Sequence, residues 1–162
     1  METTCQRPPF ADLTAAQSLT LNKGLDFAIL TALLFAQPLV SAQETTSSVR
    51  DGVYSEAQAN LGAAAFAENC SVCHGAALGG VGEAPALVGA QFISDFNGLT
   101  LGDLFERIRT TMPLNNPGAL TREQYAEILA FVLKSNGYPA GSRELYRRTE
   151  YLNAIRFEAP QN

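Results

Sequence analysis

The five residues CSVCH, at positions 70–74, constrain this chain more than any other stretch of its sequence. Two of the three cysteines and the only histidine of the 162 residues stand together there. Two cysteines at this spacing, followed by histidine, are compatible with a redox-active dithiol, with part of a zinc site, with the attachment of a c-type haem, or with chance. The other residues of the chain must show which of these four interpretations is correct.

The remaining residues argue against most of the alternatives. After residue 42 the chain has no further Cys or His, so no second cluster could complete a four-coordinate zinc site. Nothing before Cys70 resembles the strand that precedes a thioredoxin-like dithiol. We therefore expect one covalently bound haem c, with Cys70 and Cys73 forming the thioethers and His74 as the proximal iron ligand.

Met112 is the candidate for the second axial ligand. It is the only methionine after residue 42, and haem iron in proteins accepts His, Met, Cys or Tyr. Pro113 favours an extended backbone at Met112, which suits a loop residue reaching the iron better than a packing residue within a helix. A core methionine, a five-coordinate iron, and Tyr125 or Tyr138 as the ligand stay open as alternatives.

The first 42 residues have the pattern of an export signal. Lys23 precedes a nine-residue apolar run at 27–35, and Val40-Ser41-Ala42 offers the small residues of a cleavage site. The run is short against the roughly 20 apolar residues of a membrane span. We expect a signal peptide over 1–42, cleavage after Ala42 and a periplasmic protein. The membrane would be a partner only if the signal were not cleaved.

The rest of the chain divides into a polar lead-in, a helical domain and a tail. Residues 43–54 are polar and predict a flexible lead-in, and residues 75–98 are rich in Gly and Ala and predict a loop. The tail, residues 138–162, is expected to pack back on the domain over residues 55–137. Helix starts are predicted from capping patterns: at Ser55 with Gln58, at Thr100 for a helix to about Arg109, and at Thr121 with Gln124 for a helix to Lys134.

Residues 55–137 resemble the class I cytochrome c domain. Gly62 and Phe66 stand eight and four residues before Cys70, as in that family's N-terminal helix, and Ile128 and Phe131 fit its C-terminal helix. The resemblance implies an all-α bundle of three to four helices around the haem. It also implies that the two terminal helices cross, with Gly62 allowing contact against Phe131.

The same resemblance assigns roles to the residues around the haem. In the P-x-L sequence Pro85-Ala86-Leu87, the Pro85 carbonyl would accept the Nδ1–H of His74 and Leu87 would lie against the haem. Met112-Pro113 fits the distal loop. The chain lacks the tryptophan that often bonds a haem propionate. Phe96 is expected near its place but cannot donate a hydrogen bond, which leaves Arg107 and Arg109 as candidates.

More loosely, the chain resembles the small cytochromes that accompany or are fused to quinoprotein (PQQ) dehydrogenases. This implies a one-electron carrier rather than an enzyme, with a dehydrogenase as donor and an oxidase or another cytochrome as acceptor. A net charge of −5 gives no support for binding nucleic acid. The alternatives are a haem enzyme with an open distal site (peroxidase or sulfur-compound oxidation), for which a second histidine is lacking, and a haem subunit permanently docked through its tail.

Overall fold

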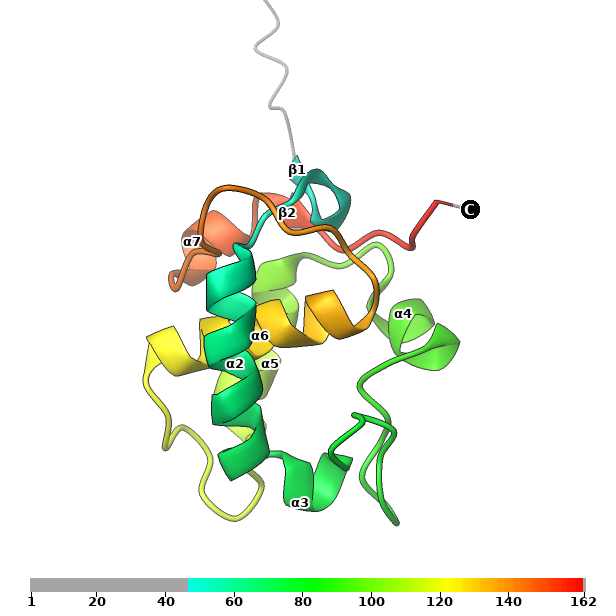
Figure 1. Cartoon of the computed structure of the whole chain (residues 1–162), viewed down its shortest axis with the longest axis vertical. Coiled ribbons are helices and arrows are strands. Elements are labelled where there is room, and N and C mark those ends of the chain that lie inside the picture. Colours follow the sequence, from blue (N-terminus) through cyan, green and yellow to red (C-terminus); the bar gives the residue numbers. More distant parts are fainter. Residues whose placement is uncertain (1–46, 162) are drawn as a thin grey trace, which may run out of the picture. The chain divides into compact units, whose positions relative to one another are not determined.

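Helices dominate the computed structural model, which describes residues 47–161 (Figure 1). The predicted signal peptide and its cleavage site after Ala42 lie outside these residues. The all-α class is confirmed, although short helices bring the described residues to six α-helices rather than three to four. The elements are β1 (Ser47–Ser48), η1 (Val49–Asp51), α2 (Glu56–Asn69), α3 (Ser71–His74), α4 (Ala90–Phe96), α5 (Leu101–Thr111), α6 (Arg122–Ser135), α7 (Thr149–Leu152) and β2 (Ile155–Arg156).

The crossing of α2 and α6 forms the centre of the fold (Figure 1). A Cβ atom built at Gly62 would lie 1.8 Å from the carbonyl oxygen of Glu127, so only glycine permits this approach of the two backbones. The rings of Phe66 and Phe131 pack beside it, with centroids 5.4 Å apart. The predicted crossing is therefore confirmed, but Gly62 faces the backbone at Glu127 rather than the ring of Phe131.

The predicted helix starts are confirmed at all three N-caps. Thr100 with Asp103, and Thr121 with Gln124, form complete capping boxes. Ser55 also accepts the backbone N–H of Gln58, but the Gln58 side chain does not return to the cap. The side-chain amide of Gln58 instead forms hydrogen bonds with the backbone of Leu145 in the tail.

The expectation of a flexible lead-in over 43–54 is wrong for residues 47–54. Val49 and Tyr54 are fully buried, and the Tyr54 hydroxyl donates to the Tyr138 carbonyl oxygen at 2.6 Å. β1 pairs in parallel with β2, so Ser47 lies opposite Ile155. The sequence pattern is misleading because the partners that bury these few apolar residues come from the far end of the chain.

The predicted loop over 75–98 also contains a helix that sequence reasoning missed. α4 begins after Gly89, whose φ is 89°, and no side chain caps it. Its stability comes from packing instead, since Phe92 and Phe96 are buried with their ring centroids 6.0 and 6.1 Å from that of Phe157. A helix without a cap, held by a residue about 60 positions away, leaves little local signal.

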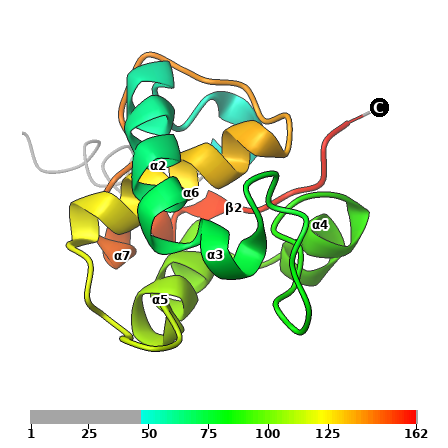
Figure 2. The same cartoon turned by 60° about the horizontal axis from the view of Figure 1, so that its bottom comes forward.

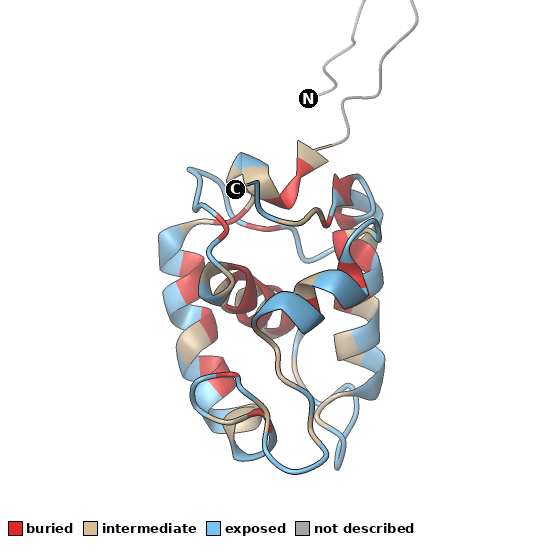
Figure 3. Cartoon of the chain, turned by 90° about the vertical axis from the view of Figure 1, so that its right-hand side faces the viewer, coloured by how far each residue is buried: buried red, intermediate tan, exposed pale blue. Residues whose placement is uncertain are grey.

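The tail is built into the core of the described residues. Buried residues lie along the inward-facing sides of the helices (Figure 3), and five apolar residues of the tail join them. The Gln58 amide, itself buried, donates to the Leu145 carbonyl oxygen at 3.1 Å and accepts the Leu145 N–H at 2.6 Å. None of the helices described for residues 47–161 has the length and apolar character that crossing a bilayer requires. The buried apolar residues of the tail are Tyr138, Leu145, Leu152, Ile155 and Phe157.

Candidate haem site

Cys70 joins α2 to α3, and the other four CSVCH residues form the single tight turn of α3 (Figure 2). Cys70 ends α2, donating its N–H to the Phe66 carbonyl oxygen at 2.9 Å, and also begins α3. The His74 N–H then donates to the Cys70 carbonyl oxygen at 2.9 Å. The turn places Cys70 half-buried, Cys73 exposed and His74 buried, all within one short helix.

The imidazole of His74 is fixed in tautomer and orientation. Its Nδ1 lies 2.8 Å from the carbonyl oxygen of Pro85, and the residue is only 8% exposed. A carbonyl oxygen can only accept, so Nδ1 carries the proton and Nε2 keeps its lone pair. A histidine held in this way is ready to bind a metal through Nε2.

A tightly folded loop brings Pro85 back to His74. The N–H of Gly80 donates to the His74 carbonyl oxygen at 2.8 Å, and the N–H of Leu87 donates to the Leu78 carbonyl oxygen at 2.7 Å. Gly80 has a φ of 78°, and a Cβ there would lie 2.4 Å from the Ala84 carbonyl oxygen. The loop therefore needs glycine at this position to close on the histidine.

Asn136, at the end of α6, holds the far end of the same loop. Its amide nitrogen donates to the Leu87 carbonyl oxygen at 2.9 Å, and its amide oxygen accepts the Gly89 N–H at 3.1 Å. Leu87 is half-buried and packs against the core. No local sequence pattern predicts this role, because the side chain bonds to a loop 47 residues earlier in the chain.

Met112 ends α5 with the extended backbone that Pro113 predicts, at φ −126° and ψ 152°. Its N–H donates to the Ile108 carbonyl oxygen at 2.9 Å. Its carbonyl oxygen accepts two hydrogen bonds, from the Gly118 N–H at 3.3 Å and from the Tyr125 hydroxyl at 2.7 Å. Hydrogen bonds thus connect the half-buried Met112 to α5 and α6. Pro85, in contrast, contacts His74 directly.

Both tyrosines considered as iron ligands use their hydroxyls elsewhere. Tyr125 donates to Met112, and Tyr138 donates to the Glu158 carbonyl oxygen at 2.9 Å. Each is almost completely buried. This arrangement disfavours a tyrosine ligand and leaves Met112 as the better candidate.

The cysteine environment disfavours a redox dithiol. Burial, and to a lesser extent the neighbouring Cys73, raise the pKa of the Cys70 thiol to about 11. Reactive dithiols need the opposite, a thiol whose pKa is lowered so that the thiolate forms. A half-buried sulfur that resists ionisation is compatible with an uncharged thioether.

The two arginines considered as propionate partners have different surroundings. The guanidinium carbon of Arg107 lies 5.9 Å from the centroid of the Phe96 ring. Arg109 is already engaged in an ion pair with Glu106, at 2.5 Å. Arg107 is therefore the more available of the two for an anionic group.

Comparison with known proteins finds a family model that is similar to the segment carrying the candidate site. Residues 57–132 match the family model described as cytochrome c oxidase, cbb3-type, subunit III. Curated proteins give no match. Among solved structures, the chain is similar to the sulfane dehydrogenase SoxCD from Paracoccus pantotrophus, with a TM-score of 0.44 and 22% identity. The similarity covers 70% of this chain and 61% of the SoxCD chain, so less than two thirds of that chain's length is represented.

The family match spans the whole segment that carries CSVCH, the Pro85 loop and Met112, from α2 to α6. The helical fold and the geometry of His74 agree with it. The described residues have an all-α, cytochrome c-like fold, and residues 57–132 are similar to the cbb3-type subunit III family.

Proposed function

We propose that this chain is an exported carrier of single electrons that holds one haem c. The observation that supports this most is the 2.8 Å contact between His74 Nδ1 and the Pro85 carbonyl oxygen, at the end of the CSVCH turn. It leaves Nε2 as a free donor atom beside two cysteines that have no disulfide partner. Neither a redox-active dithiol nor a histidine buried only for packing would require a free Nε2 next to two unpaired cysteines.

The roles of the residues follow from their chemistry. Cys70 and Cys73 would form thioethers, His74 and Met112 would be the axial ligands, and Leu87 would pack on the proximal side. The bound group would supply a reversible one-electron change at iron. If His74 and Met112 both held the iron, no side of the group would be left open for a substrate, which would favour a carrier over an enzyme.

The proposed partners are redox proteins on both sides of the carrier. We propose a periplasmic dehydrogenase of the quinoprotein type as donor, and an oxidase or another cytochrome of the respiratory chain as acceptor. The export pattern in residues 1–42 supports the periplasmic location, since attachment of c-type haem is completed outside the bacterial cytoplasm. Methionine with histidine as axial ligands raises the potential of the iron, which suits this position between donor and acceptor.

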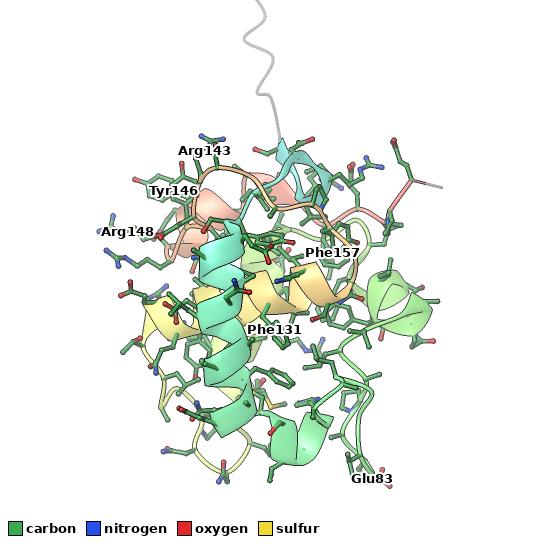
Figure 4. The ribbon with its side chains drawn as sticks, in the orientation of Figure 1. Glu83, Phe131, Arg143, Tyr146, Arg148 and Phe157 are labelled. Atoms are coloured by element: carbon green, nitrogen blue, oxygen red, sulfur yellow. The ribbon has the colours of Figure 1, made fainter. Side chains whose placement is uncertain are left out.

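A second candidate is a haem subunit that stays docked to its dehydrogenase. Tyr146 and Tyr151 are each about half exposed and pack together on the tail with ring centroids 5.0 Å apart. Arg143 and Arg148 are exposed on the same side of the molecule (Figure 4). Tyrosine and arginine are typical of binding hot spots. Co-elution with a dehydrogenase in size-exclusion chromatography, lost in Tyr146→Ala, would favour this candidate.

The covalent haem is tested by acid–acetone extraction of the protein made in a host with a c-type maturation system. We expect the colour to stay with the protein, and the pyridine haemochrome to correspond to one haem per chain with both vinyl groups saturated. Cys73→Ser should shift the haemochrome band to longer wavelength, because one vinyl group stays unsaturated. Release of free haem from the unmodified protein would contradict the proposal.

A further inference from the structure

We infer that Tyr125 is a positioning residue that holds Met112 at the iron through a hydrogen bond to the Met112 carbonyl oxygen. The inference rests on the proposed role of Met112 as an axial ligand. It adds to the candidate site a residue of α6. This residue lies outside CSVCH, outside the loop that carries Pro85 and outside the segment that carries Met112.

The contact is short and fully buried on the tyrosine side. The Tyr125 hydroxyl lies 2.7 Å from the Met112 carbonyl oxygen, and Tyr125 is 1% exposed. Tyr125 lies in the first turn of α6, which is fixed by the capping box of Thr121 and Gln124. The donor therefore comes from a rigid part of the fold.

The acceptor lies at the start of a segment with few other anchors. α5 ends at Thr111, and Pro113 has no N–H to donate. Residues 114–119 are all exposed, and Leu114 is 79% exposed. Within the described residues, the other backbone hydrogen bonds of 113–119 stay inside residues 112–119, whereas the Met112 carbonyl is bonded to α6 through Tyr125. The Tyr125 bond is the shorter of the two that this carbonyl accepts.

Loss of this bond should free the Met112 side chain more than it unfolds the protein. A single intramolecular hydrogen bond changes an equilibrium by roughly three- to tenfold. Here the equilibrium is between a closed site, with the Met112 sulfur at the iron, and an open one that accepts an external ligand. A variant lacking the hydroxyl should therefore bind cyanide roughly three- to tenfold more tightly in the ferric state.

The chain offers a matched control for this experiment. Tyr54 is also 1% exposed, and its hydroxyl also donates to a backbone carbonyl oxygen, that of Tyr138, at 2.6 Å. Tyr54→Phe removes the same kind of bond without touching Met112. If Tyr125 acted only as a satisfied core tyrosine, both phenylalanine variants would have the same effect.

The test compares Tyr125→Phe, Tyr54→Phe and Met112→Ala as purified holoproteins. Cyanide binding is titrated in the ferric state, and the near-infrared charge-transfer band of methionine-ligated haem is followed with temperature. We expect Tyr125→Phe to bind cyanide more tightly and to lose the band at a lower temperature. Tyr54→Phe should match the unmodified protein in both readouts, although both variants unfold at lower urea concentration.

The outcomes separate this inference from the proposed function. If Met112→Ala keeps the near-infrared band and the cyanide affinity of the unmodified protein, Met112 is not the ligand, and both fail. If Met112→Ala loses the band but Tyr125→Phe behaves like Tyr54→Phe, the ligand assignment stands and the role of Tyr125 is wrong. Tighter cyanide binding by Tyr125→Phe alone among the two phenylalanine variants supports the inference.

Discussion

Gly62 and Gly79 are both glycines without a left-handed backbone, yet their surroundings differ completely. A Cβ at Gly62 would collide with the Glu127 carbonyl oxygen, whereas nothing lies within 4 Å of a Cβ at Gly79. The crossing was predicted from the resemblance to the class I cytochrome c domain, to which Gly62 and Phe66 before Cys70 contribute. The resemblance could not show that the glycine meets backbone, because that depends on the rotation of α6.

Gly62→Ala should lower the free energy of unfolding by about 2 kcal/mol or more, since a rigid backbone rather than a flexible side chain must move. Gly79→Ala is the matched control and should change it by less than about 0.5 kcal/mol. Urea denaturation of both variants measures the difference. Gly80 would be a poor control, because its φ of 78° already requires glycine. Equal midpoints for the Gly62 and Gly79 variants would contradict the crossing.

α6 is the element that connects the two sides of the candidate site. Its first turn holds Met112 through Tyr125, and its C-terminal end holds Leu87 and Gly89 through Asn136. Sequence reasoning predicted the limits of α6 well, since Thr121 and Gln124 give a clear capping pattern. It could not predict these two contacts, because each joins a polar group on the helix to the backbone of a distant loop.

Glu106 connects three helices and responds to pH. From α5 it accepts hydrogen bonds from Arg109, also on α5, and from Thr149 of α7, and lies 3.7 Å from Arg122 of α6. The Arg109 hydrogen bonds, followed by that of Thr149, lower the pKa of Glu106 from its usual 4.5. A carboxyl whose folded pKa is lowered stabilises the protein above the unfolded pKa, and this stabilisation is lost as the pH falls through the folded pKa.

Glu106→Gln should therefore unfold at lower urea concentration than the unmodified protein at pH 7, because the charged contacts are lost. The difference should be modest, about 1 kcal/mol or less, since the carboxyl is partly exposed. It should shrink as the pH falls from 4.5, the usual pKa that applies in the unfolded chain, through the lower pKa of folded Glu106. A difference that stayed constant from pH 7 to pH 3 would show that the charge of Glu106 does not matter.

At the scale of the whole molecule, the two ends of the described chain close the fold together. The Gln58 amide exchanges two hydrogen bonds with the Leu145 backbone, and β1 pairs with β2. The sequence suggested that the tail packs on the domain, but placed Gln58 in a capping box. The Gln58 side chain bonds to the backbone of Leu145, 87 residues away, instead of to the N-cap of its own helix.

Gln58→Leu should lower the free energy of unfolding by about 2 kcal/mol or more, because it leaves the buried N–H and carbonyl of Leu145 without partners. Gln91→Leu is the control, since Gln91 is exposed and contacts only Asp95 in its own helix. It should change stability by less than about 0.5 kcal/mol. Limited proteolysis should also cut the tail of the Gln58 variant faster. Equal stability of the two variants would mean that the tail is held by its apolar side chains alone.

The pairing of Ser47 with Ile155 also places both short strands at the same end of the described structure. β1 and β2 lie at one pole of the described structure, and α3 with the CSVCH residues lies at the other (Figure 1). A tether fixed close to either strand leaves from the same pole. Immobilisation close to either strand would then present the cysteine pole outward, and a domain joined close to either strand would leave that pole accessible to a binding partner.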